Sequence, residues 1–407
     1  MLLVRRPPLR RGACGGRRLH SALVKCLLAT AILLCACLML GLSLGQAGAG
    51  PISPLREVRP PRVVAREAEA EVYGGRTLSL CPNVYGKVDV LVAVNVESLK
   101  RFYGVAQRSL RCYLKSTNYT LRVVDLYGDA RVQRECPHKQ LLFRKHCAAS
   151  VYLREADWLL VLDADTGVVN PDHCLEEWIE PRADLIFYER FYNWEIASGN
   201  YLAKNSSAAR SFLRQWADYE FKQPSNFNGA DNGALQILLL ETLLPGSKPE
   251  IRACHRIWRA GTGYETYMRF VMCCKTALGG RRLWTSPPSP VAVLLLRRAH
   301  GWVRDAVLTA DRWCERDFML HGWKANRVGQ DGWMSPFTRD LNVSECGVDG
   351  NEGWPWRKGY QFTSELIKAL LRHREAYFAL TFPEAARGYL FHAESDAADC
   401  WPDCEHF

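Results

Sequence analysis

The chain has 407 residues, of which 48% are apolar, and it carries a formal net charge of +10. This length and composition suffice for one large domain or two ordinary domains with a substantial core, and they exclude a chain that is disordered throughout. Seven of the 53 basic residues lie within residues 1–25, which hold no acidic residue, so 46 basic residues face 43 acidic residues in the remainder. Because a surplus of three charges is too small to bind a phosphate backbone, we exclude DNA- and RNA-binding proteins.

A membrane anchor is predicted directly after the basic N-terminal segment. Cys26 to Leu44 is a run of 19 uncharged residues, which as a helix would be about 28 Å long and would match a bilayer core. Since the positive charge lies on its N-terminal side, we expect a cytosolic tail at 1–25, an anchor at 26–45 and a lumenal bulk, which is single-pass type II topology. The alternative is a cleaved signal peptide and a secreted protein.

Cysteine usage agrees with an oxidising lumen. Twelve of the 16 cysteines follow the predicted anchor, which allows up to six disulfides whose pairing the sequence leaves open. Residues 46–86 are rich in Pro, Gly, Ala, Arg and Glu, have no sustained apolar period and are expected to form a stem.

Downstream of the stem, apolar patterns typical of strands and helices alternate. The expected strands are 88–96, 121–126, 158–169, 184–188 and 194–203, and the expected helices are 105–113, 139–154, 205–219, 234–244 and 364–377. This alternation predicts an α/β fold with Rossmann-like winding, in which ligands bind at the carboxyl ends of strands.

Two segments depart from the alternating pattern. Gly279–Arg298 contains a Pro-Ser cluster and a short apolar run, and we expect an inserted loop there. Residues 347–407 are expected to form a C-terminal extension behind a catalytic domain at 87–346.

Asp163 and Asp165 are the leading candidate site residues. They follow the apolar run WLLVL, and because alternate residues of a strand point to one side, both carboxylates are expected at the carboxyl edge of the sheet. Two such charges beside an apolar core are costly, and a divalent cation with oxygen ligands compensates both. The alternative is that Asp163 caps the next turn and Asp165 pairs with a Lys or Arg. Asp172 and His173, in the turn after Asn170-Pro171, are less favoured ligands.

The motifs ADWLLVLDADTGVVNP, LIFYERFYNWEIASGNYLAKN, GADNGALQ and WCERDFMLHGWK resemble those of an uncharacterised lumenal glycosyltransferase-like family expanded in nematodes, from about Val88 to Cys346. More distantly, the chain is similar to the GT-A superfamily of nucleotide-diphospho-sugar transferases, including its glycogenin-like branch and the fungal galactosyl and mannosyl transferases. The resemblance implies a GT-A, Rossmann-like mixed sheet flanked by helices, behind the anchor and stem.

The resemblance also implies roles for individual residues. In those relatives an Asp-x-Asp pair binds metal and donor, and a late His followed by Gly and Lys supplies a further ligand and a phosphate contact. Here this implies metal ligation by Asp163, Asp165 and His321 and a phosphate contact by Lys324, although the spacing to that lysine is shorter.

Two further residues are candidates with simple structural alternatives. Asp231, before a buried helix, is the catalytic candidate, as a base or as an acceptor-positioning group; the alternative is a helix cap. Asn95, just past the first strand, is expected to contact the nucleotide; the alternative is a turn residue.

These parts predict a manganese-dependent glycosyltransferase of the Golgi membrane that uses a nucleotide-diphosphate sugar and a glycan or glycoprotein acceptor. The glycogenin-like resemblance favours retention of the anomeric configuration. The alternatives are a lumenal glycan-binding protein with the same fold and a nucleotide-sugar hydrolase. The donor sugar, the acceptor linkage and the oligomeric state stay open.

Overall fold

The computed structural model describes residues 80–285, 287, 289–347, 351, 353–383, 395–399 and 401–402. The predicted tail, the anchor and nearly all of the stem lie outside these residues, as does part of the C-terminal extension. Among the described residues, no helix is both long enough and apolar enough to cross a membrane. The chain divides into two units, Met1–Pro61 and Arg62–Phe407, and the described residues all belong to the second unit.

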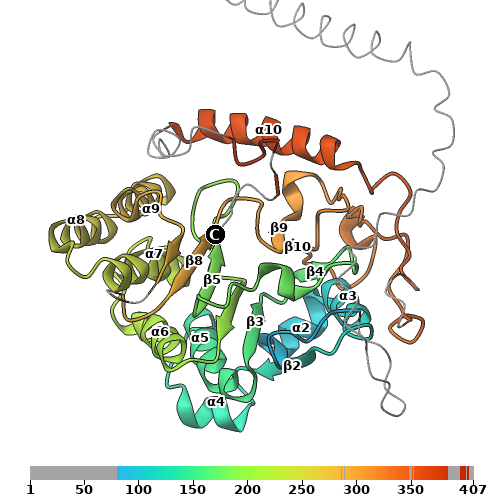
Figure 1. Cartoon of the computed structure of the whole chain (residues 1–407), viewed down its shortest axis with the longest axis horizontal. Coiled ribbons are helices and arrows are strands. Elements are labelled where there is room, and N and C mark those ends of the chain that lie inside the picture. The colour runs from blue at the N-terminus through green and yellow to red at the C-terminus, as the bar shows by residue number, and fades with distance from the viewer. Residues whose placement is uncertain are drawn as a thin grey trace, which may run out of the picture. The chain divides into compact units, whose positions relative to one another are not determined.

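The described residues form a mixed α/β fold, as the sequence pattern predicts (Figure 1). The strands are β1 (Val88–Val94), β2 (Thr120–Asp125), β3 (Trp158–Leu162), β4 (Thr166–Val168), β5 (Leu185–Tyr188), β6 (Tyr201–Lys204), β7 (Leu283–Trp284), β8 (Val293–Leu296), β9 (Val303–Asp305) and β10 (Met319–His321). The helices are α2 (Val96–Phe102), α3 (Gly104–Tyr113), α4 (Ala130–Glu135), α5 (Leu141–Tyr152), α6 (Ser207–Ala217), α7 (Ala230–Leu243), α8 (Lys248–Arg259), α9 (Tyr264–Leu278) and α10 (Ser364–Thr381).

A seven-stranded sheet forms the centre, in the order β2-β1-β3-β6-β5-β8-β7. Strand β1 runs parallel to both β2 and β3, whereas β6 is antiparallel to β3 and to β5. A second sheet of three strands has the order β4-β10-β9. The chain passes from the first sheet to the second directly after β3, and this crossing places the candidate site.

Apolar side chains cover both faces of the central sheet, because the runs in β1 and β3 are apolar at every position but Asp89. Leu91 and Leu159 point into a core shared with α5, α6, α7 and α9. Val90 and Leu160 point to the other side, into a core shared with α3 and the small sheet. The labelled helices lie accordingly on both sides of the strands in Figure 1.

Two predicted strands are wrong in part. The predicted strand 158–169 ends at Leu162, because the chain turns at Asp163, where the Thr166 amide donates to the Asp163 carbonyl at 3.0 Å. The predicted strand 194–203 is a strand only from Tyr201 on. Residues 194–200 before it form a loop in which polar side chains bind backbone groups, and that competes with a strand ladder.

The predicted inserted loop Gly279–Arg298 is also wrong in part. Its ends form β7 and β8, and β8 is fully buried and pairs in parallel with β5. The Pro-Ser cluster supplies only the connection between these two strands, while the apolar run VLLL completes the central sheet. Burial against neighbouring strands decides the structure of such a short run.

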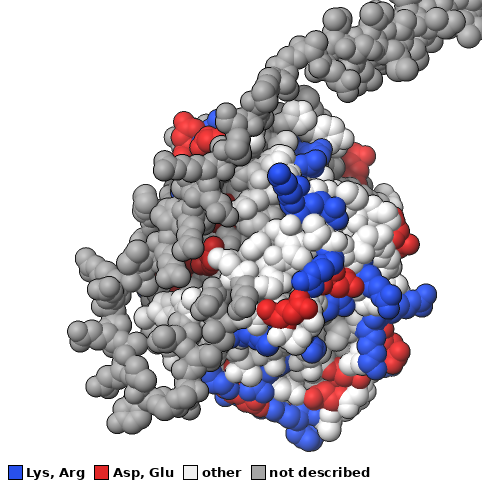
Figure 2. All heavy atoms as spheres, turned by 90° about the vertical axis from the view of Figure 1, so that its right-hand side faces the viewer, with Lys and Arg blue, Asp and Glu red and all other residues white. Residues whose placement is uncertain are grey.

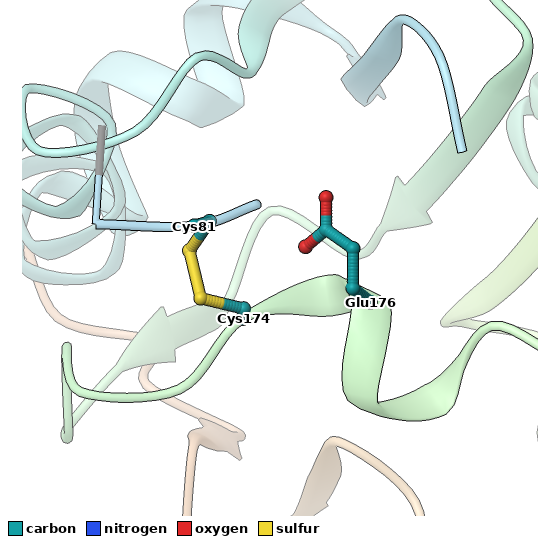
Figure 3. A group of neighbouring side chains, drawn as sticks. All are labelled: Cys81, Cys174 and Glu176. Carbon is teal, nitrogen blue, oxygen red and sulfur yellow. A yellow bond between two sulfur atoms is a disulfide. The ribbon is translucent and has the colours of Figure 1, made fainter. Parts of the chain in front are cut away.

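Four disulfides lie within the described residues, two of them between distant parts of the chain. They join Cys81 to Cys174, Cys112 to Cys346, Cys136 to Cys147 and Cys254 to Cys273. Figure 3 shows the first of these beside Glu176, the carboxylate of which points toward the sulfur atoms. Because the two sulfurs are bonded to each other, this group is a disulfide next to an acid rather than a thiolate metal site.

Surface charges in the described part often occur as ion pairs, for example Arg154 with Glu135 at 3.2 Å and Arg182 with Glu180 at 2.8 Å. On the face shown in Figure 2, basic and acidic side chains are interspersed rather than gathered by sign.

Candidate metal and substrate site

The Asp163-Ala164-Asp165 motif lies in the turn that leads from β3 to β4. The Asn200 side-chain oxygen accepts from the Asp163 amide at 2.9 Å and from the Thr166 hydroxyl at 3.0 Å, and Gln107 donates to the Ala164 carbonyl at 3.0 Å. These buried bonds hold the turn in one conformation.

A close approach of the backbone at Gly199 shapes the same turn. A Cβ atom at this position would lie 2.1 Å from Oδ2 of Asp163. Any larger residue would therefore push the Asp163 carboxylate away from its observed place.

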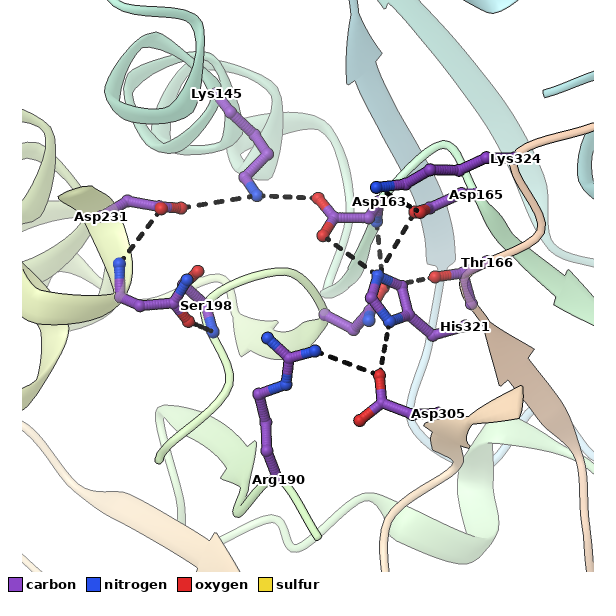
Figure 4. A network of polar contacts seen from close by, with 12 residues as sticks. Lys145, Asp163, Asp165, Thr166, Arg190, Ser198, Asp231, Asp305, His321 and Lys324 are labelled. Carbon is purple, nitrogen blue, oxygen red and sulfur yellow. Dashed lines mark hydrogen bonds and ion pairs between the residues drawn. The ribbon is translucent and has the colours of Figure 1, made fainter. Parts of the chain in front are cut away.

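His321 joins the two aspartates through strand pairing. Strand β10 pairs antiparallel with β4 so that His321 is opposite Thr166, one residue past the motif. Its Nε2 atom lies 3.3 Å from Asp165 Oδ1 and 3.7 Å from Asp163 Oδ2 (Figure 4). One ligand atom from each of the three residues falls within 4.8 Å of the others. The structure thus brings the three predicted ligands together.

Asp305 orients the His321 ring from behind. Strand β9 runs parallel to β10 and places Asp305 beside His321, where its Oδ1 lies 2.8 Å from Nδ1. The carboxylate fixes which ring nitrogen faces Asp163 and Asp165, as carboxylates commonly do for metal-binding histidines. Arg190 contacts the same Asp305 oxygen at 3.2 Å.

The charge of His321 dominates the electrostatics of the three side chains. Burial disfavours the charged ring, but hydrogen bonds to Asp165 and Asp305 outweigh burial and raise the pKa of His321 to about 10. Burial likewise opposes ionisation of Asp165, yet the contact with His321 keeps the pKa of Asp165 below its usual value. The cluster is therefore built around one positive charge held between carboxylates.

This donor set fits a divalent cation. Two carboxylates and one imidazole nitrogen are ligands for ions such as Mn²⁺, and they converge at the carboxyl end of a parallel strand. His321 already has the orienting carboxylate that such a ligand needs.

A chain of buried charges continues from Asp163 to Asp231. Lys145 on α5 lies 2.9 Å from Asp163 Oδ1 and 3.7 Å from Asp231 Oδ2, and its side chain is 3% exposed. The neighbouring His146 places Nε2 3.1 Å from Asp231 Oδ2 and Nδ1 3.1 Å from the Tyr201 hydroxyl. Figure 4 shows Lys145 between the two aspartates. The basic partner Lys145 thus belongs to Asp163, whereas the predicted alternative gave such a partner to Asp165, and Asp163 also remains near His321.

Burial raises the free-energy cost of each charged side chain between Asp163 and Asp231, and pairing with an opposite charge offsets that cost. Burial opposes the charged form of Asp231, but His146 and Lys145 lower the pKa of Asp231 to about 2. Burial lowers the pKa of His146 to about 4, against the opposing effect of Asp231. His146 is therefore neutral at physiological pH.

The folded protein is expected to lose stability as the pH falls from 6.5 to 4. In this window the unfolded state binds a proton at His146 and the folded state does not, so folding is opposed by roughly 3 kcal/mol at the acidic end. Urea unfolding at several pH values should show this loss, and His146→Gln should remove most of it. An unchanged pH dependence in that variant would contradict the assignment.

Lys324 and Asn95 have different structural settings. Lys324 Nζ is 3.9 Å from Asp165 Oδ2, and its side chain is 71% exposed, so it stands at the rim. The loop that carries it is tied to the motif, because the Gly322 and Trp323 amides donate to the Asp165 carbonyl at 3.1 and 2.9 Å. Asn95 caps α2 by accepting from the Ser98 amide at 3.1 Å, which is a helix cap rather than the simple turn of the alternative, and its contact with a nucleotide stays a prediction.

Sequence reasoning missed several residues of the cluster. These are Lys145, His146, Asn200, Asp305 and Tyr103. One signal was present: the sequence RKH interrupts an otherwise apolar helix α5 that is buried from Phe143 on, and buried charges in such a helix need partners. Tyr103 is half-buried, and the charges of Asp165 and Asp163 add to burial in raising its pKa.

Comparisons with solved structures find glycosyltransferases at low similarity. A glycosyltransferase involved in the glycosylation of the major capsid of PBCV-1 matches at 12% identity and a TM-score of 0.34, over 58% of this chain and 93% of that one. The glycosyltransferase GlyE of Streptococcus pneumoniae TIGR4 matches at 15% identity and 0.28, over 43% and 50%. The bifunctional WbbM matches at 11% identity and 0.27, over 48% and 45%.

No curated protein matches the sequence of this chain. One family model does match, over residues 110–332, which include β3, the Asp163-Ala164-Asp165 turn, Asp231 and His321. Since this is more than half of the chain, the protein belongs to the family described as "Protein of unknown function, DUF273".

Proposed function

We propose that the chain is a metal-dependent glycosyltransferase that moves a sugar from a nucleoside-diphosphate donor to a glycan or glycoprotein acceptor. The observation that carries the proposal is the convergence of Asp163, Asp165 and His321 within 4.8 Å at the carboxyl end of β3. The predicted anchor and the cysteines that follow it extend the proposal to a Golgi location and type II topology. The resemblance to GT-A transferases extends it to manganese as the ion.

The proposed metal ligands are Asp163, Asp165 and His321, with Asp305 holding His321 in its tautomer. A divalent cation bound there would offset the negative charge that develops on the departing nucleoside diphosphate. Lys324, exposed and beside Asp165, is placed to contact a phosphate from the rim. Tyr103 is half-buried near the same carboxylates, the charges of which add to burial in raising the pKa of its hydroxyl.

Asp231 fits a positioning role better than that of a general base. Its carboxylate is 1% exposed and already accepts from His146, and its pKa of about 2 makes it a weak proton acceptor at physiological pH. It holds Lys145, which in turn holds Asp163. A reaction that retains the anomeric configuration needs no such base, and we propose retention on this ground.

One assay tests the proposal against its two alternatives. The full-length chain is incubated with a panel of nucleotide sugars and Mn²⁺, with and without glycan acceptors, and nucleotide release is measured. We expect release that acceptors stimulate and that a chelator abolishes. Release without any dependence on acceptor would instead indicate a hydrolase, and binding of glycans without release would indicate a binding protein; either result rejects the transferase.

A further inference from the structure

A cavity lies at the opposite end of the small sheet from the metal ligands. It has a volume of about 270 Å³, near the lower limit of pockets that hold small molecules, about 300 Å³. Strands β9 and β10 are parallel, and their carboxyl ends carry Asp305 and His321. Trp302 and Phe318, which line the cavity, directly precede the amino ends of the same strands. The cavity is therefore separate from the candidate metal site.

Two residues that line the cavity each carry a buried polar atom that has no hydrogen-bond partner among the described residues. The atoms are Nε1 of Trp302, which is 1% exposed, and Nε2 of His300, which is 7% exposed. Buried polar groups are nearly always satisfied, so two such atoms on residues that line one cavity indicate that something else supplies their partners.

The hydrogen-bonding character of each atom is determined by its surroundings. The Trp302 indole nitrogen can only donate. The other ring nitrogen of His300, Nδ1, lies 2.9 Å from the Arg298 carbonyl, which can only accept, so Nδ1 carries the hydrogen. Burial lowers the pKa of His300 and keeps the ring neutral. His300 Nε2 is consequently an acceptor, and the residues that line the cavity carry one unmet donor and one unmet acceptor.

The charged side chains around the cavity have partners within the protein. Glu177 lies 2.9 Å from His173, and Arg304 donates to Asp317 at 2.8 Å. Aromatic rings form much of the remaining wall: Trp178 stacks on Phe318 with ring centroids 5.5 Å apart, and Trp401 lines the cavity as well. Glu177 is exposed and lies at the rim. The cavity thus suits a neutral ligand with one flat apolar face and hydroxyl groups.

We propose that this cavity binds one neutral sugar unit, the hydroxyls of which donate to His300 Nε2 and accept from Trp302 Nε1 while a face of the ring packs on the aromatic wall. A hydroxyl group is both donor and acceptor, so a polyhydroxylated ring meets both unmet groups. The site goes beyond the proposed transfer reaction, because it would recognise a sugar remote from the metal ligands.

The test uses saturation-transfer NMR on the full-length chain without metal or nucleotide. The probes are free glucose, galactose, mannose, xylose and N-acetylglucosamine, and the β-methyl glycosides and disaccharides that end in them. We expect transfer to at least one sugar type. Stronger transfer to the glycosides would identify a terminal glycan residue as the ligand, and equal transfer to the free sugars would identify a monosaccharide.

Two matched variants locate the binding. Trp302→Phe keeps an aromatic ring but removes the donor, and it should weaken binding about tenfold. His300→Asn keeps a donor near the position of Nδ1 for the Arg298 carbonyl but removes the acceptor and should weaken binding similarly, whereas His300→Gln keeps a polar atom near Nε2 and should weaken it less. Asp165→Asn in the metal cluster should leave this binding unchanged. Circular dichroism monitors the fold of each variant.

The proposal is overturned if none of the sugars shows transfer, or if transfer is the same in wild type, Trp302→Phe and His300→Asn. It is equally overturned if a crystal structure of the sugar-soaked protein shows only ordered water bridging the two nitrogen atoms.

Discussion

Asp165→Asn is expected to lower acceptor-dependent release of nucleotide about 10³-fold. The substitution keeps the size of the side chain and removes the charge that faces His321 Nε2 at 3.3 Å. An amide is a much weaker ligand for a hard cation than a carboxylate, so affinity for Mn²⁺ should fall as well. Initial rates with saturating donor, together with calorimetric titration of Mn²⁺, measure both effects.

Asp172→Asn is the matched control for this substitution. Asp172 is exposed seven residues further along the chain, where its carboxylate accepts from Asn351 at 3.1 Å. The control should keep both the wild-type rate and the wild-type affinity for Mn²⁺. If Asp165→Asn binds Mn²⁺ as tightly as wild type, the assigned metal site is wrong even if the rate falls.

Asp231→Ala is expected to lower the free energy of unfolding by about 4 kcal/mol, within the range for removing one partner of a buried ion pair. The change leaves the His146 ring without its carboxylate partner and leaves Lys145, which is 3% exposed, with Asp163 alone. A buried cation that loses half of its compensation is costly because water cannot replace the missing charge. Urea denaturation of the full-length chain at pH 7 gives the difference directly.

Asp399→Ala tests whether the loss comes from burial. Asp399 pairs with Arg372 at 2.9 Å, but its side chain is 93% exposed, and such surface pairs contribute little to stability because water screens them. If Asp231→Ala and Asp399→Ala lower the free energy of unfolding equally, the buried charges around Asp231 do not stabilise the fold as described.

The sequence predicted the structure correctly where the composition of a single stretch of chain is enough to determine its burial. The apolar runs of β1 and β3 and the strongly apolar α7 are buried in the structure, because a run without polar residues has no stable place at the surface. The same reasoning failed for β8, the four apolar residues of which are too few to distinguish a strand from a loop without their neighbour β5. It failed again at residues 194–200, which supply Ser198, Gly199 and Asn200 to the site as a loop.

Within the candidate site, the sequence by itself determined a pair of acids at the end of a buried strand, and resemblance added His321. Only the tertiary structure decided that Lys145, Asn200 and Asp305 belong with them. The physical reason is that these contacts depend on which strands pair and in which register. His321 reaches Asp165 because β10 lies beside β4, and Lys145 reaches Asp163 because α5 packs against the central sheet. Neither contact can be read from the local sequence around these residues, because each depends on how distant elements pack.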